Sequence, residues 1–157
     1  MKIVFLDIDG VLNSAAYDRN KPTDGGNIDV TRLELLKALV DKTGARIVLT
    51  SSWREHWEKN PEDMDEKGVE LAETFKKAGL EIYDKTPFIG YLERSKEIRL
   101  WLEENGEVES FVIIDDFAFG WDELSCNFVQ TNYRIGRGLG EEHIERAVEI
   151  LGKSEQE

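Results

Sequence analysis

Acidic residues stand in pairs directly after two apolar segments of the chain. Asp7 and Asp9 lie in FLDIDGV, and Asp115 with Asp116 closes VIIDD. One carboxylate of such a set can attack phosphorus to form an aspartyl phosphate, while another protonates the leaving oxygen and later activates water. Carboxylates facing a phosphate repel it, which implies a metal ion, and magnesium suits an all-oxygen site. Taken alone, D-x-D-G also fits a calcium-type or plain turn.

Hydroxyl side chains follow a third apolar segment, which ends in Thr50-Ser51-Ser52. Together with the amides of a following helix, these hydroxyls can hold phosphate oxygens, although alone they fit an ordinary helix cap. Three strand-end motifs of matching polarity arise by chance much less readily than one. The sequence therefore favours a phosphate site with Mg²⁺, whose predicted ligands are Asp7, Asp9, Asp115 and Asp116.

Short apolar runs alternate with helical patterns along the chain, as in βαβ units. Ile, Val and Phe enrich these runs, as expected of parallel strands covered on both faces. The predicted strands span residues 3–6, 46–50, 111–114 and 127–131, with a shorter one at 81–83. We predict a doubly wound, Rossmann-like α/β sheet with helices on both faces, in one domain over residues 1–152 followed by a tail at 153–157.

The helical patterns each combine one apolar stripe with a glycine stop. Thr31 with Glu34 predicts a capping-box start for the first helix, and Gly44 predicts its end. Trp53, Trp57 and Trp121 follow strand ends, and we interpret them as side chains that cover the sheet edge.

Composition limits the classes of function. A length of 157 residues with 40% hydrophobic content suits one globular domain, and no segment has the length of a membrane span. The single cysteine, Cys126, is expected to be a buried structural thiol in the reducing cytoplasm. A net charge of -13 provides no counterion release, so we expect no stable nonspecific nucleic-acid binding. We expect no membrane partner, because no apolar run is long enough to span a bilayer.

The motifs FLDIDGV, IVLTSS and VIIDD, in this order, resemble the haloacid dehalogenase (HAD) superfamily of phosphotransferases. The resemblance spans Met1 to about Phe117. It implies that Asp7 is the nucleophile and that Asp9 is the general acid and base, which also lends its main-chain carbonyl to magnesium. Thr50, or less strongly Ser51, then binds the phosphate. The acidic pair of VIIDD, Asp115 and Asp116, completes the metal shell.

A narrower resemblance rests on LTSSWR, KTP, RSKEIRLWL and GLGEEHI. These segments are similar to the HAD domain associated with Swiss Army knife RNA repair proteins. The superfamily places a cation near the start of a later helix, where Arg94 matches the pattern, Lys96 also qualifies, and Lys85 is a weaker third. Arg54 is a second basic group near the phosphate, or an exposed helix arginine paired with Glu55 or Glu58.

The resemblance implies a magnesium-dependent phosphomonoesterase, and the chain offers no obvious cap domain over its site. The segment 13–31 is too short for a folded cap, so the crevice is open to bulky substrates. We expect action on phosphorylated nucleic-acid ends, with a nucleotide or other small-molecule phosphatase as the alternative. A non-catalytic phosphate-binding domain is the alternative of another class. Arg134 and Arg137 lie in a glycine-rich loop that can contact a substrate phosphate or form only a turn.

Overall fold

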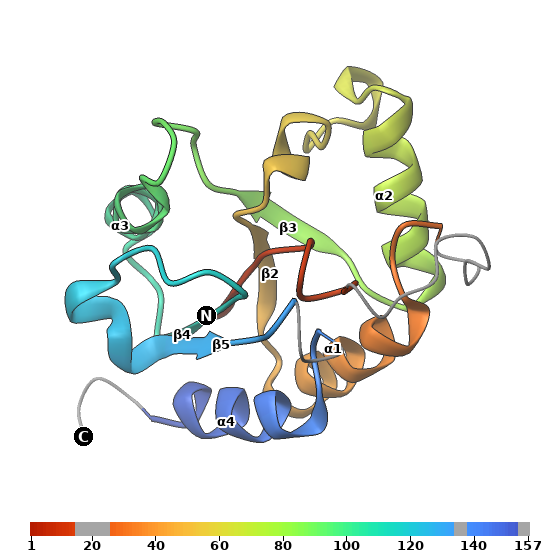
Figure 1. Ribbon diagram of the computed structural model, residues 1–157. Helices are drawn as coiled ribbons and strands as arrows, with labels where there is room; N and C mark the ends of the chain where they lie inside the picture. Colours follow the sequence, from red (N-terminus) through yellow and green to blue (C-terminus); the bar gives the residue numbers. More distant parts are fainter. Residues whose placement is uncertain (15–25, 134–137, 154–157) are drawn as a thin grey trace.

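The structure is a computed structural model, and it describes residues 1–14, 26–133 and 138–153 (Figure 1). Five parallel strands form one sheet in the order β3-β2-β1-β4-β5. The strands are β1 (Lys2–Leu6), β2 (Arg46–Leu49), β3 (Ile82–Lys85), β4 (Ser110–Asp115) and β5 (Phe128–Gln130). Because β1 has β2 on one side and β4 on the other, the strand order reverses there, and ligands of open α/β sheets bind at such a point.

Helices cover both faces of the sheet, which confirms the doubly wound α/β prediction (Figure 1). The helices are α1 (Val30–Thr43), α2 (Glu66–Lys77), α3 (Arg94–Glu104) and α4 (Glu141–Leu151). Apolar residues of α1, α2 and α4 pack on one face, whereas α3 and the 3₁₀ helix Asp122–Asn127 pack on the other. Two further 3₁₀ helices span Ser52–Glu55 and Pro61–Asp63. The described residues include no folded cap over the strand ends.

The alternation of side chains along β1 determines where its acidic residues point. Val4 and Leu6 pack with α1 on one face, and Ile3 and Phe5 pack with α3 on the other. Side chains two residues apart share a face, so Asp7 continues the α3 side just beyond the strand end. Asp7 therefore emerges on the face where α3 begins.

Two local predictions are wrong. The N-cap of α1 is Asp29, whose carboxylate accepts hydrogen bonds from the Thr31 amide at 3.1 Å and the Thr31 hydroxyl at 2.7 Å. Thr31 therefore lies inside the helix instead of capping it with Glu34. Cys126 is exposed instead of buried, and it lies in the 3₁₀ helix Asp122–Asn127 before β5. In the described part of the chain, every helix is too short or too polar to cross a bilayer.

Candidate active site

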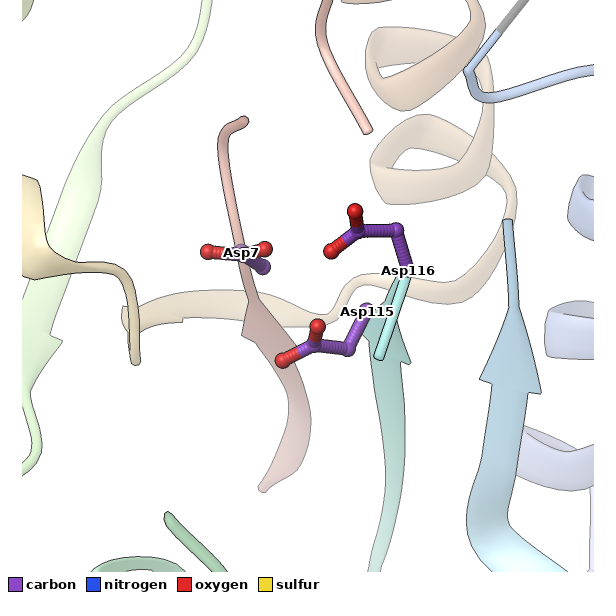
Figure 2. Close-up of side chains that lie close together, drawn as sticks. All are labelled: Asp7, Asp115 and Asp116. Carbon is purple, nitrogen blue, oxygen red and sulfur yellow. The ribbon is translucent and has the colours of Figure 1, made fainter. Parts of the chain in front are cut away.

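The carboxyl ends of β1 and β4 bring three carboxylates together. Leu6 pairs with Ile114, and the Asp7 amide donates to the Ile114 carbonyl at 3.0 Å, so Asp7 lies beside Asp115. Figure 2 shows the side chains of Asp7, Asp115 and Asp116 at these two strand ends. One oxygen from each carboxylate lies within 4.8 Å of the other two. Asp7 is only 6% exposed and Asp115 is fully buried.

Arg94 faces this cluster from the first turn of α3. Its Nη1 lies 2.6 Å from Asp115 Oδ2 and 3.3 Å from Asp7 Oδ1. Burial raises the pKa of Asp7 well above its usual value, and the negative charges of Asp115 and Asp116 raise this pKa further against the opposing effect of Arg94. Burial likewise raises the pKa of Asp115, again against Arg94. Proximity to two carboxylates outweighs burial at Arg94, whose pKa is raised.

The charges of this cluster fit a divalent cation. When all three carboxylates are ionised, the single Arg94 guanidinium leaves about two negative charges in a largely buried place. Oxygen ligands from carboxylates are those that hard cations such as Mg²⁺ prefer. Asp7, Asp115 and Asp116 can therefore hold a metal ion. The Asp9 carboxylate does not belong to this close group.

Asp9 lies at the outer side of the same turn, where two side chains orient its carboxylate. Asn13 Nδ2 donates to Asp9 Oδ1 at 3.0 Å, and Trp53 Nε1 donates to Asp9 Oδ2 at 3.1 Å. Asn13 Oδ1 also accepts from the Gly10 amide at 3.0 Å, which fixes the turn itself. The interpretation of Trp53 as a cover of the sheet edge is therefore incomplete. Its place directly after the TSS motif was the signal that could have linked it to Asp9.

Gly10 allows Asp116 to approach the first turn. Gly10 has a φ of 83°, and a Cβ built there would lie 2.3 Å from Asp116 Oδ2. The Gly10 carbonyl also accepts from the Thr131 hydroxyl at 2.7 Å. No larger residue fits this position without moving the Asp116 carboxylate away from the cluster.

Gly10→Ala is expected to lower the free energy of unfolding by more than the ~1–2 kcal/mol that a left-handed conformation costs a residue with a Cβ. The matched control is Gly44→Ala, because Gly44 has a φ of 72° and its Cβ would meet no described atom within 4 Å. Urea unfolding of both variants separates backbone strain from displacement of Asp116. Equal losses in the two variants would contradict the proposed crowding at Gly10.

Thr50 and Ser51 differ in their surroundings. Thr50 is fully buried, its amide donates to the Leu6 carbonyl at 3.0 Å, and its hydroxyl has no hydrogen-bond partner among the described residues. A buried hydroxyl without a partner is costly, and a bound group that reached Thr50 would supply the missing hydrogen bond. Ser51 instead caps the 3₁₀ helix Ser52–Glu55 by accepting from the Trp53 amide at 3.2 Å.

The other predicted cations lie outside the carboxylate cluster. Lys96 is separated from Arg94 by two helical positions, so it points elsewhere, and its exposed ammonium pairs with Glu93 at 3.0 Å. Lys85 Nζ donates to Glu58 Oε1 at 2.8 Å and to two backbone carbonyls. Of the three candidates for the phosphate cation, Arg94 is therefore the one that the structure places beside Asp7.

Arg54 is buried, not exposed, and its ion pair is with Glu97 instead of a neighbouring glutamate. Its Nη1 also donates to the Thr50 carbonyl at 2.8 Å and to Thr86 Oγ1 at 2.9 Å. Burial lowers the pKa of Arg54, and the charge of Glu97 opposes that shift. Arg54 thus fixes the position of the Thr50 backbone through the hydrogen bond to its carbonyl.

A shallow depression of about 330 Å³ surrounds the cluster. Its polar lining comes from Asp7, Asp9, Ser52, Arg94, Asp115 and Asp116. Three apolar side chains that the sequence motifs did not identify, Leu92, Phe117 and Phe119, complete the lining. The Phe119 ring lies 4.6 Å from the Arg94 guanidinium carbon. Arg134 and Arg137 lie outside the described residues, as does most of the segment 13–31.

Comparison with known proteins agrees with this arrangement. Residues 3–144 match the family described as the HAD domain in Swiss Army Knife RNA repair proteins. The chain belongs to this family. The matched segment runs from β1 into α4 and contains every residue that lines the depression.

This HAD domain family indicates a phosphatase-type hydrolase connected with RNA repair. HAD proteins generally use Mg²⁺, and the carboxylates of Asp7, Asp115 and Asp116 provide a group able to bind a metal ion. No curated protein and no solved structure gives a significant match to the chain.

Proposed function

We propose that this HAD domain is a Mg²⁺-dependent phosphomonoesterase that forms an aspartyl phosphate on Asp7 and acts on phosphorylated nucleic-acid ends. The observation that carries the proposal is the buried group of Asp7, Asp115 and Asp116 facing Arg94 at the switch point of the sheet. A structural ion pair needs neither the third carboxylate nor a place at a strand end open to solvent.

In the first step, a carboxylate oxygen of Asp7 forms a bond to phosphorus while the bond between phosphorus and the leaving oxygen breaks. The Asp9 carboxyl donates its proton to that oxygen. In the second step, the Asp9 carboxylate takes a proton from water, the water oxygen bonds to phosphorus, and the bond to Asp7 breaks. Asn13 and Trp53 hold Asp9 toward the reacting group in both steps.

Two further groups of the chain, together with the metal ion, act on the substrate phosphate. The Arg94 guanidinium reduces the repulsion between Asp7 and the phosphate, and the Thr50 hydroxyl offers a hydrogen bond that no described residue uses. Asp7, Asp115 and Asp116 would hold Mg²⁺, which would supply positive charge against the negative charge of the phosphoryl oxygens.

The substrate assignment rests on the family and on the open site. The family is named for RNA repair proteins, and no described segment closes the depression. The net charge of -13 weakens binding to a long nucleic acid, so recognition is limited to the end itself. The same charge favours the alternative, a phosphatase of nucleotides or other small molecules.

The alternative of another class is a non-catalytic phosphate-binding domain. Such a domain does not need a nucleophile, so the presence of Asp7 beside Asp115 and Asp116 argues against it.

Phosphate release from matched substrates tests the proposal. The panel contains oligonucleotides phosphorylated at the 3′ or the 5′ end, mononucleotides and sugar phosphates, each with Mg²⁺ or with EDTA. We expect release that requires Mg²⁺ and a kcat/KM highest for one oligonucleotide end. Preference for a mononucleotide or a sugar phosphate would support the small-molecule alternative, and no release from any substrate would support the binding domain.

A further inference from the structure

An apolar groove of about 500 Å³ adjoins the carboxylate cluster. It lies between the 3₁₀ helix Ser52–Glu55 and the loop 86–92 that leads into α3. Ser52, Leu92, Arg94 and Phe119 line both the groove and the depression around Asp7, so the two are continuous. A group attached to a phosphate at Asp7 can therefore extend into the groove.

Large apolar side chains are exposed on the loop that forms one wall of this groove. Phe88 is 67% exposed, Tyr91 is 93% exposed and Leu92 is 69% exposed. Scattered exposed apolar residues are common on protein surfaces, but a group of them beside a polar site marks a binding surface. The rings of Phe88 and Tyr91 lie edge to face with centroids 6.2 Å apart, so each ring keeps a face uncovered by the other.

Contacts to β2 and α3 hold the loop 86–92 in place. The Thr86 amide donates to the Leu49 carbonyl at 2.9 Å, and the Ile89 amide donates to Glu97 Oε2 at 3.2 Å. The guanidinium carbon of Arg54 lies 5.5 Å from the centre of the Phe88 ring. Leu92 has a φ of 61°, a conformation that costs a non-glycine residue energy and is found at binding sites. The exposed rings therefore sit on an anchored loop, which lowers the ordering cost of binding.

The charges along the groove exclude a second phosphate as its occupant. Of its three basic lining residues, Arg54 and Lys85 are paired with carboxylates away from Asp7, and Arg94 is already assigned to the phosphate at Asp7. What the groove offers is aromatic and aliphatic surface of the size of a small organic ligand. A nucleobase combines a flat apolar face with a direct covalent link to the sugar whose phosphate reaches Asp7.

We propose that this groove binds the nucleobase of the terminal nucleotide by stacking it on one of the Phe88 and Tyr91 rings, while the other ring, perpendicular to the first, contacts its edge. The inference rests on the proposed function, because it takes the reacting phosphate to lie at Asp7. It explains how a chain with a net charge of -13 can recognise a nucleic-acid end: the contact uses one base and its phosphate, with no need for a basic surface along the strand.

The test compares two oligonucleotides that carry the same terminal phosphate on either a normal or an abasic nucleotide. Wild type is expected to prefer the normal end by about tenfold in kcat/KM, as stacking of one base predicts. Phe88→Leu and Tyr91→Leu keep the apolar surface but remove the rings, and each is expected to reduce this preference by lowering kcat/KM for the normal end more than for the abasic end. Because both side chains are exposed, neither variant should unfold.

Tyr133→Leu is the matched aromatic control. Tyr133 is also exposed, but it lines another depression, which shares Asp9 and Asp116 with the one around Asp7 and shares no lining residue with the groove. Loss of the base preference in this variant alone would place the base on that side and overturn the proposal. Equal rates on normal and abasic ends, with a higher kcat/KM for a phosphopeptide, would overturn it in favour of a protein substrate.

A binding measurement separates this inference from the proposed function. Oligonucleotides with terminal 2-aminopurine are expected to lose fluorescence on binding to wild type in EDTA, and to lose less on binding to Phe88→Leu. Such quenching without turnover of any phosphate would sustain the groove assignment and refute the phosphatase. Turnover of oligonucleotide ends without quenching or base preference would do the reverse.

Discussion

Asp7→Asn is expected to reduce phosphate release by at least about a thousandfold while the protein stays folded. Asparagine has nearly the volume of aspartate, but its amide is not a nucleophile. The substitution also removes one of three neighbouring carboxylates. Burial of the Asp7 carboxyl and the negative charge of Asp115 raise the pKa of Asp7, so its ionised form at neutral pH destabilises the fold. In EDTA at neutral pH the variant should therefore be at least as stable as wild type. kcat/KM and the midpoint of thermal unfolding measure the two effects.

A suitable control is Asp41→Asn, because Asp41 is exposed on α1 and pairs only with Lys37 among the described residues. It removes the same charge far from the cluster and should leave kcat/KM unchanged. If Asp7→Asn were largely unfolded under the assay conditions, its lost activity would reflect unfolding, which would contradict the expectation that the substitution removes the nucleophile and leaves the fold intact. Turnover retained in Asp7→Asn would refute the assignment of Asp7 as the nucleophile.

Arg54→Met is expected to lower the free energy of unfolding by about 3–5 kcal/mol, the cost of leaving one member of a buried ion pair alone. Glu97 is 2% exposed and keeps its charge next to the gap. The Thr50 carbonyl and the Thr86 hydroxyl also lose the donor that joins them. Urea unfolding gives the change directly, with Lys96→Met as a control that removes an exposed charge.

The double variant Arg54→Met, Glu97→Met distinguishes the ion pair from simple loss of packing. Removal of both charges should restore much of the stability that Arg54→Met loses, because no unpaired carboxylate remains buried. The Ile89 amide still loses its acceptor on Glu97, so the groove loop should remain less ordered. A double variant less stable than either single variant would contradict this explanation.

The placement of the acidic motifs was predictable because it depends on strand ends alone. Asp7 and Asp115 each follow an apolar run, and the carboxyl ends of neighbouring parallel strands meet at one edge of the sheet. Side-chain alternation then turns Asp7 toward α3. Arg94 was identified only from the resemblance to the family, and its contact with both carboxylates agrees with that choice.

Contacts between distant segments could not be predicted in this way. Arg54 pairs with Glu97, 43 residues later, and Trp53 donates to Asp9, 44 residues earlier. For Arg54 the nearby Glu55 was an equally good partner by charge, and only burial against α3 decides between the two glutamates. The exposed rings of loop 86–92 were missed for a similar reason, because exposure is not visible in a short apolar stretch.

The N-terminal boundary of α1 shows a limit of local signals. Asp29 and Thr31 are both good capping residues, and the sequence pattern favoured Thr31 because Glu34 stands three residues later. In the structure Asp29 is the N-cap, since its carboxylate accepts a hydrogen bond from the Thr31 amide, and the helix therefore begins at Val30.

The most direct test of the mechanism is to locate the phosphoryl group on the protein. The protein would be mixed with the best substrate and Mg²⁺, quenched in acid within a single turnover, digested, and analysed by mass spectrometry. Asp9→Asn would be treated in parallel, because loss of the base should slow hydrolysis of the intermediate. Our account predicts one phosphoryl group on Asp7 in wild type or in Asp9→Asn. Phosphate release with the phosphoryl group on another residue, or on none in either protein, would contradict it.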